Sequence, residues 1–243
     1  MNKTTIIIPS RLNAQRFPNK PLKLINNKEM ILHVYDAAVK SNAGEVYVAT
    51  PDQKIVDTVK NSGGNVIKTS ENHETGTDRI FEVFKTKLNS EPNIIINLQG
   101  DMPNIKPNAI LRLEKFMRSN NCDIGTMASN IKDKNEITDP NVVKVHMEEK
   151  LKEDNFLNAK DFFRTRKILS NEKIYHHIGI YAFTNDALTK YVKLKRSKLE
   201  IERNLEQMRA MENNLIIKVG LCDSKPLGVD TEKDLIKVRK EMN

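Results

Sequence analysis

The chain has 243 residues, a length that buries a large core without disulfides and fits one domain, with or without an insert. Its formal net charge is +8, but the basic residues are scattered and Trp is absent, so the sequence offers no stacking platform for nucleic acid. No apolar run approaches the roughly 18 residues of a membrane span. Because no N-terminal segment fits a signal peptide either, we expect a soluble, cytoplasmic protein.

Apolar, β-branched runs predict the strands of a sheet, at residues 4–9, 45–50, 65–69, 93–101, 178–183 and 215–221. Apolar residues recur at helical spacing over residues 30–40, 52–62, 77–88, 108–118, 197–213 and 231–242. Strands that alternate with helices predict an α/β fold with a mostly parallel sheet and right-handed crossovers. In such sheets, ligands gather at the carboxyl ends of the strands.

Residues 123–177 follow a different pattern. The stretch VVKVHMEEKLKEDNFL, residues 142–157, alternates valines with polar residues, passes a charged turn and returns. This pattern is typical of an antiparallel hairpin. We therefore expect a single domain over residues 1–243 that carries an antiparallel insert at residues 123–177.

A basic loop, IPSRLNAQRFPNKPL, follows the first predicted strand and carries Arg11, Arg16 and Lys20 with no acidic residue between them. Arginine forks match phosphate oxygens in pairs, and lysine adds a mobile point charge. Neither a P-loop nor a dinucleotide-binding glycine pattern is present. The loop predicts a polyphosphate site at the ligand edge of the sheet, and a chance cluster of surface charges is the alternative.

Two carboxylates are candidates for a Mg²⁺ site. Asp101 follows the strongest strand, in NLQGDMP, where an aspartate that merely caps a turn is the alternative. Asp230 lies in GVDTEKDL, where Thr231 and Asp234 make a plausible capping box and leave Asp230 free. Mg²⁺ takes one or two carboxylates together with phosphate oxygens and water, so the pair suits a nucleoside triphosphate complex.

Two further stretches carry weaker signals. In GTDRI, Thr77 or Asp78 is expected to cap a helix, and Arg79 in the first turn gains nothing from the helix dipole, which indicates a ligand-facing role. In YHHIGIY, His177 and Tyr181 stand four residues apart around a strand. Paired histidines are often structural, so these two residues alone do not define a site.

Taken together, the motifs resemble the 3-deoxy-manno-octulosonate (Kdo) cytidylyltransferases. The matching motifs, in family order and over nearly the whole chain, are IPSR, RFPNKPL, GTDR, NLQGDMP, HIGIY, LEQMR and GVDTEKDL. The resemblance implies a Rossmann-like nucleotidyltransferase fold whose antiparallel insert helps to form a homodimer. It also implies the transfer of CMP from CTP to Kdo with Mg²⁺, releasing pyrophosphate, for lipopolysaccharide biosynthesis.

The resemblance also implies roles for individual residues. The CTP phosphates would be held by Arg11, Arg16 and Lys20, of which Arg11 and Lys20 act in catalysis together with Asp101. The residues near the nucleotide would be Arg79 and Gln99, and the Mg²⁺ ligands would be Asp101 and Asp230. The sugar-acid pocket would be lined by His177, Tyr181, Glu206 and Gln207.

Two positions depart from the family pattern on the sugar side. Asn158 stands where the F-S-R-A-x-I-P motif has its arginine, with Arg164 or Arg166 as substitutes, and Arg203 replaces the second glutamate of L-E-x-x-E-x-L-E-Q. These departures lead to the hypothesis that the acceptor is a modified ulosonic acid, such as an 8-amino-octulosonate. A cytidylyltransferase for acylneuraminate and a basic nucleic-acid-binding protein are the rival functions.

Overall fold

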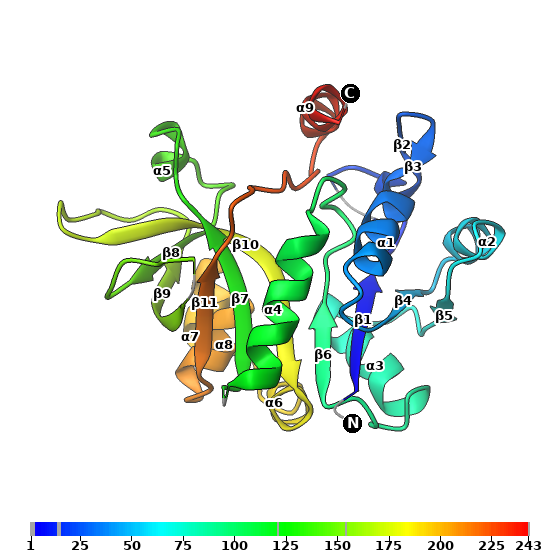
Figure 1. Cartoon of the computed structure of the whole chain (residues 1–243), viewed down its shortest axis with the longest axis horizontal. Helices are drawn as coiled ribbons and strands as arrows, with labels where there is room; N and C mark the ends of the chain where they lie inside the picture. The colour runs from blue at the N-terminus through cyan, green and yellow to red at the C-terminus, as the bar shows by residue number, and fades with distance from the viewer. Residues whose placement is uncertain (1–2, 14–15, 121, 154, 243) are drawn as a thin grey trace.

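The parallel half of the sheet forms as the sequence predicts. The computed structural model describes residues 3–13, 16–120, 122–153 and 155–242. Within them, the strands of the main sheet follow the order β5-β4-β1-β6-β10-β7-β11-β9-β8 (Figure 1). The first strands are β1 (Thr4–Pro9), β4 (Glu45–Thr50), β5 (Val66–Lys68) and β6 (Ile94–Asn97), and they pair in parallel.

The second half of the sheet is mixed. Its strands are β7 (Ile124–Ser129), β8 (Lys144–Met147), β9 (Phe156–Phe163), β10 (Lys173–Thr184) and β11 (Ile217–Leu221). Strand β10 runs antiparallel to both β6 and β7, whereas β11 is parallel to β7 and antiparallel to β9. A separate ribbon pairs β2 (Leu24–Ile25) with β3 (Lys28–Glu29). The predicted α/β fold is confirmed, in a sheet that is parallel in its first half and mixed in its second.

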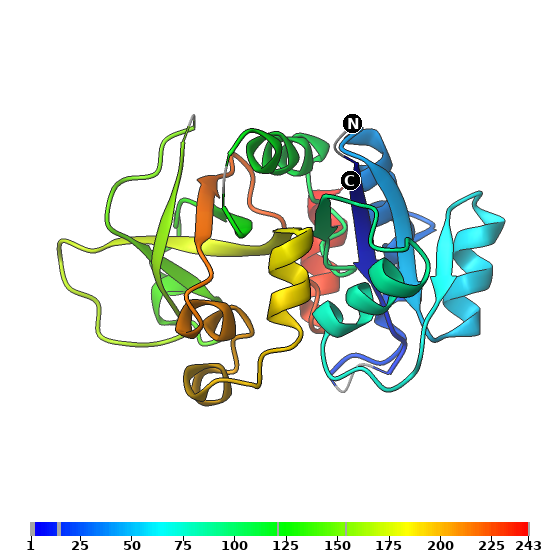
Figure 2. The ribbon, with the colours of Figure 1, turned by 90° about the horizontal axis from the view of Figure 1, so that it is seen from below.

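Helices cover both faces of the sheet (Figure 2). One face packs against α1 (Met30–Lys40), α2 (Gln53–Asn61) and α4 (Pro107–Ser119). The other face packs against α3 (Gly76–Thr86), α6 (Asn185–Tyr191), α7 (Lys198–Arg203) and α8 (Gln207–Glu212). In β1, Ile6 and Ile8 enter the first core and Ile7 enters the second, which explains the uninterrupted apolar run. The short α5 (Asn135–Thr138), the 3₁₀ helix η1 (Lys20–Leu22) and α9 (Glu232–Glu241) complete the fold.

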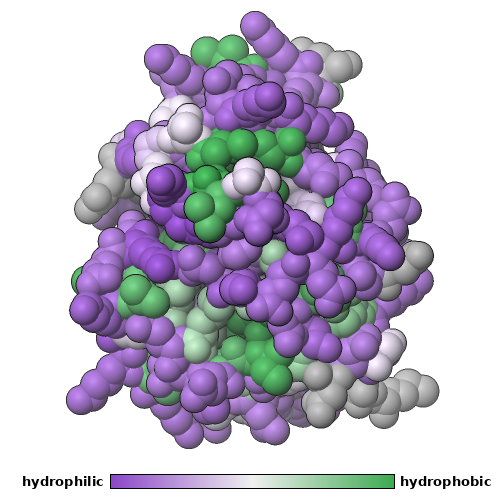
Figure 3. Space-filling model, turned by 90° about the vertical axis from the view of Figure 1, so that its left-hand side faces the viewer, coloured by the Kyte–Doolittle hydropathy of each residue, from purple (hydrophilic) through white to green (hydrophobic). Residues whose placement is uncertain are grey.

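The predicted hairpin is present. Strands β8 and β9 pair antiparallel, and β8 also pairs with the first residues of β10. Figure 3 shows the face of the molecule on this side, where hydrophobic patches are separated by hydrophilic side chains. Leu169, in the connection between β9 and β10, is among the large apolar side chains that are exposed. A role of this region in a homodimer stays a prediction.

The single helix predicted over residues 197–213 is wrong, because α7 and α8 are separate helices. Asn204 adopts the left-handed conformation, with φ 51°, and ends α7. Asparagine tolerates this conformation better than other residues with a side chain, so it stops the helix despite the continuous apolar spacing. Helix α8 then begins at Gln207 in a new direction, next to Glu206.

Candidate active site

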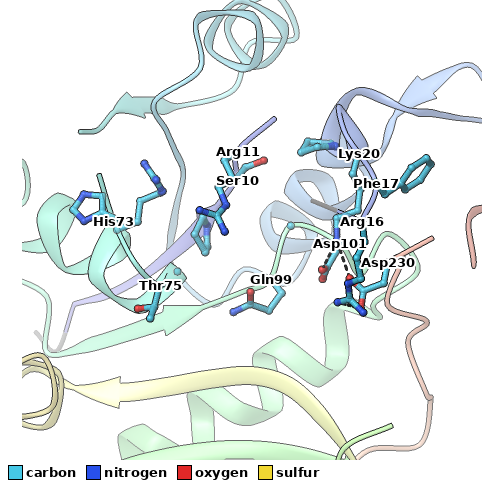
Figure 4. Close-up of a pocket in the computed structure, with 15 residues that line it drawn as sticks. Ser10, Arg11, Arg16, Phe17, Lys20, His73, Thr75, Gln99, Asp101 and Asp230 are labelled. Carbon is cyan, nitrogen blue, oxygen red and sulfur yellow. Dashed lines mark hydrogen bonds and ion pairs between the residues drawn. The ribbon is translucent and has the colours of Figure 1, made fainter. Parts of the chain in front are cut away.

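The loops that follow β1 and β6 line one cleft of about 430 Å³. These strands are parallel neighbours, so their carboxyl ends meet at the same edge of the sheet. The cleft contains every residue for which a nucleotide or metal role is predicted: Arg11, Arg16, Lys20, Arg79, Gln99, Asp101 and Asp230. Figure 4 shows Lys20, Arg16 and the two aspartates grouped at one end, with His73 and Thr75 at the other end and Gln99 between.

Lys20 joins the two carboxylates that the sequence places far apart. Its Nζ lies 2.9 Å from Asp101 Oδ2 and 3.3 Å from Asp230 Oδ1, and the lysine side chain is only 14% exposed. Arg16 Nη2 adds a contact of 2.9 Å to Asp230 Oδ2. Burial alone would lower the pKa of Lys20, but the carboxylates outweigh it and the pKa stands above its usual value. Lys20 therefore stays charged at neutral pH.

The helix cap that frees Asp230 is confirmed. Thr231 caps α9 and forms a capping box with Asp234, so the Asp230 carboxylate takes no part in the cap. The backbone amide of Val229 donates to the carbonyl of Asp101 at 2.9 Å. This bond holds the C-terminal carboxylate beside the one that follows β6.

The donor set fits a hard divalent cation. Because two carboxylates reach one ammonium nitrogen, they are close enough to share a single ion. Within the residues that the structure describes, no group of three or more His, Cys, Asp or Glu side chains is arranged so that it could hold a metal ion by itself. A cation held here by Asp101 and Asp230 would therefore need phosphate oxygens and water to complete its shell, as Mg²⁺ does in triphosphate sites.

Arg79 is anchored mainly to the protein. Its guanidinium donates to the Thr69 hydroxyl and, at 2.8 Å, to the Ser70 carbonyl. Burial, followed by the nearby charge of Arg11, lowers its pKa. The helix that carries Arg79 is capped by Thr75 in a capping box, so the caps predicted at residues 77 and 78 are wrong. A contact between Arg79 and the nucleotide stays a prediction.

A second cavity of about 600 Å³ adjoins the cleft and contains all four residues predicted for the sugar acid: His177, Tyr181, Glu206 and Gln207. The two cavities share the lining residues Arg11, Arg16, Gly76, Gln99, Asp101 and Asp230. A ligand in one cavity therefore touches residues that also face a ligand in the other. This arrangement suits two substrates that react with each other.

A β-bulge brings His177 and Tyr181 together. Ile178 pairs with Met127 and Tyr181 pairs with Thr126, so residues 179–180 are extra in β10. Four residues of a regular strand span about 13 Å, whereas the two ring centroids are 5.4 Å apart. The bulge therefore makes one aromatic wall from residues that a straight strand would separate.

His177 is neutral at physiological pH. Burial, and to a lesser degree the neighbouring His176, lowers its pKa to about 3. Its Nε2 lies 3.0 Å from Thr126 Oγ1, and that hydroxyl donates to the Ile180 carbonyl at 2.7 Å. The hydroxyl proton is thus already committed, so His177 Nε2 carries a proton and Nδ1 is left as an acceptor. Such an acceptor suits a sugar hydroxyl.

A chain of hydrogen bonds connects the two cavities. The Gln99 amide donates to Asn97 at 3.1 Å, the Asn97 amide donates to the Thr77 hydroxyl at 3.4 Å, and this hydroxyl donates to Glu206 at 3.0 Å. Burial raises the pKa of Glu206, and the Thr77 hydrogen bond lowers it only in part. The chain runs in one direction, so its members polarise each other.

The two departures from the family pattern lie outside both cavities. Asn158 is exposed on β9, opposite Lys218 of β11. Arg203 forms an ion pair with Asp161. Of the two proposed substitutes, Arg164 lines the second cavity. The other, Arg166, binds Glu172 instead. Asn158 and Arg203 therefore give no support for an altered acceptor.

Several lining residues are missed by the sequence reasoning, namely Ser10, His73 and Thr75 in the cleft and Thr77 and Asn97 in the second cavity. Three of them, Ser10, Thr77 and Asn97, stand inside motifs already singled out, so position within a motif is the signal that identifies them. His73 and Thr75 precede α3 without any distinctive pattern. Only the folded chain brings them to the cleft.

The fold and the paired cavities define a nucleotidyltransferase. The cytidylyltransferase family model matches residues 5–219. A Kdo cytidylyltransferase of Bartonella quintana is 42% identical over 240 residues, covering 98% of each chain. One of Thermodesulfovibrio yellowstonii is 40% identical, covering 99% of this chain and 98% of the relative. The chain belongs to the Kdo cytidylyltransferase family.

Solved structures agree with this assignment. A CMP:2-keto-3-deoxy-manno-octonic acid synthetase complexed with CTP is similar, with a TM-score of 0.88, 35% identity, and coverage of 99% of this chain and 98% of the other. A 4-diphosphocytidyl-2C-methyl-D-erythritol synthase from Anaerococcus prevotii has a TM-score of 0.67 at 15% identity, with the same coverage, and shares the fold. Among the described residues, none of the helices combines the length and apolar character that a membrane crossing requires.

Proposed function

We propose that this protein transfers CMP from CTP to the anomeric hydroxyl of Kdo and releases pyrophosphate. The observation that carries the proposal is the meeting of Lys20, Asp101 and Asp230 in a cleft that opens onto a second, polar cavity. The names of relatives at 40–42% identity and the CTP complex of the similar structure support both substrates.

On the nucleotide side, Arg11, Arg16 and Lys20 bind the triphosphate and hold the α-phosphorus beside the second cavity. Asp101 and Asp230 are the groups that would hold Mg²⁺, which when bound supplies neutralising charge on the phosphate oxygens. The cations of the loop then stabilise the charge that develops on the departing pyrophosphate. No covalent intermediate is needed, because positioning and electrostatics supply most of the rate.

On the acceptor side, Arg164 is the cation proposed to pair with the sugar carboxylate. It lines the second cavity and otherwise donates only to the backbone carbonyls of Pro140 and Asn141, at 3.1 and 3.3 Å, among the described contacts. His177 accepts a hydrogen bond from one sugar hydroxyl, and Glu206, which Thr77 holds in place, accepts one from another hydroxyl. The anomeric hydroxyl then lies next to the residues shared by both cavities. It attacks the α-phosphorus of CTP in line with the departing pyrophosphate.

The direct test measures pyrophosphate release from CTP with Kdo, with an 8-amino-octulosonate, with an acylneuraminate and with no acceptor. We expect release that requires both Mg²⁺ and Kdo. If another acid is clearly preferred, that acid and not Kdo is the acceptor. If no acid gives pyrophosphate release, the proposal is refuted. Salt-sensitive binding to DNA without any release would instead favour the nucleic-acid-binding rival.

The metal role is tested with Asp101→Asn, which keeps the size of the side chain and removes its charge. We expect the fold to survive and turnover to be abolished. Asp57→Asn, the same change at an exposed position of α2 outside both cavities, is the control. Retention of Mg²⁺-dependent release by Asp101→Asn would contradict the ligand assignment.

A further inference from the structure

The segment that carries Asp230 has little structure of its own. Residues 222–230, here called the C-terminal strap, lie in neither a helix nor a strand and cross from β11 to α9 (Figure 1). Its backbone is held by the Cys222 amide on Ala128 at 2.7 Å, the Leu227 amide on Asn104 at 2.9 Å, the Val229 amide on Asp101 at 2.9 Å and the Asp230 amide on Asp234 at 3.2 Å. The end of the strap is also anchored by Val229, which is buried against Ile25 and Leu235, so residues 223–226 are the part whose position depends most on side-chain tethers.

One tether comes from the insert. Glu136, on α5, is only 8% exposed and uses both carboxylate oxygens. Its Oε1 accepts from Lys225 Nζ of the C-terminal strap at 2.8 Å, and its Oε2 accepts from His176 Nδ1 of β10 at 2.7 Å. Burial alone would raise the pKa of Glu136, but these partners hold it below the usual value. One carboxylate therefore ties the strap to the strand that carries His177.

We propose that Glu136 is a positioning residue that fixes the C-terminal strap so that Asp230 meets Lys20 and the metal. This inference rests on the proposed function, because it assigns Asp230 to the metal. Since His176 directly precedes His177, the same carboxylate sets the acceptor wall and the metal carboxylate relative to each other. Loss of the tether leaves both ends of the site intact and loosens their alignment.

The test compares Glu136→Gln with Glu172→Gln. Glu172 is a matched control, since its side chain is also mostly buried in the insert, at 12% exposure, and it binds Arg166 at 2.8 Å without touching the strap. Hydrogen exchange at the Val229 amide is the first measurement. We expect exchange about tenfold faster in Glu136→Gln, equivalent to about 1.4 kcal/mol, and unchanged in the control.

The second measurement is the rise in melting temperature on titrating MgCl₂ at a fixed CTP concentration. Glu136→Gln should need several-fold more Mg²⁺ for half of the effect, whereas a merely structural loss would lower the melting temperature without moving this midpoint. Lys225→Met should reproduce both changes, and it serves if Glu136→Gln does not fold. The double variant should add little to either single change, because all three remove one tether.

Two outcomes would overturn the inference: unchanged exchange at Val229 in Glu136→Gln and Lys225→Met, or equal acceleration in Glu172→Gln. A failure of this inference can be distinguished from a failure of the proposed function. If wild-type protein shows no CTP-dependent response to Mg²⁺, the proposed function fails, while the exchange data still decide whether Glu136 holds the strap.

Discussion

Replacing Lys20 by methionine separates a catalytic role from a structural one. Methionine keeps the length of the side chain and removes its charge. The two ion pairs of Lys20 involve carboxylates that are 31% and 47% exposed. Lys20 itself is mostly buried, but both carboxylates remain hydrated, so each pair should stay within the about 0.2–1 kcal/mol of exposed pairs and the loss of stability should not exceed about 2 kcal/mol. The fold should therefore survive.

Turnover should fall much further. Removing one donor aimed at developing charge costs roughly 10²–10³ in rate, or about 2.7–4 kcal/mol. The assay is pyrophosphate release under saturating CTP and Kdo, alongside urea unfolding of the same samples. Lys23→Met is the matched control, because Lys23 lies over the Phe17 ring and does not line the cleft.

Removal of the ammonium also leaves Asp101 and Asp230 without the cation that they share. Mg²⁺ alone, without CTP, should then raise the melting temperature of Lys20→Met more than that of the wild type. Turnover within tenfold of the wild type would refute the catalytic role. A response to Mg²⁺ no larger than that of the wild type would refute the sharing of one cation by both carboxylates.

Two other substitutions probe the remaining parts of the site, and a third probes a buried ion pair outside it. Ser10 is 7% exposed and its hydroxyl has no partner within the described structure. Ser10→Ala should therefore raise KM for CTP about fivefold without loss of stability. Ser129→Ala removes another buried unpartnered hydroxyl and should leave KM unchanged. Arg164→Met should raise KM for Kdo at least about tenfold and leave KM for CTP unaltered; equal effects on both would contradict its role. Arg209→Met breaks a buried bidentate pair with Glu200 and should lower the free energy of unfolding, measured in urea, by about 3–5 kcal/mol. Adding Glu200→Leu to the same chain should restore most of this loss. If the losses of the two substitutions simply added in the double variant, this explanation would be wrong.

The central strands β1 and β6 of the parallel half were predictable because both of their faces are buried. TTIIIP, residues 4–9, sends alternate isoleucines into two separate cores, and this leaves an unbroken apolar run in the sequence. The break at Asn204 was not predictable from spacing alone, since both α7 and α8 bury apolar residues on the same core. A single left-handed residue outweighed the periodicity.

The basic loop and Asp101 were predictable because each follows a strand end, and Asp230 was predictable because the Thr231 capping box leaves it free. Their meeting at Lys20 depends on β1 and β6 being neighbours and on the Thr231 cap. The acceptor side was less predictable from the sequence, because a β-bulge is what brings His177 and Tyr181 together. The position of Arg164 in the second cavity was also not predictable, because the family motif aligns its arginine with Asn158 and not with Arg164.

The residues shared by the two cavities have a kinetic consequence. Kdo is an anion, and an anion that occupies the second cavity alone meets Arg11 and Arg16, the same side chains that we propose bind the triphosphate. We therefore expect excess sugar acid to compete with CTP and slow the enzyme. The productive order of addition is then nucleotide first and acid second, and the inhibition should fade as CTP is raised.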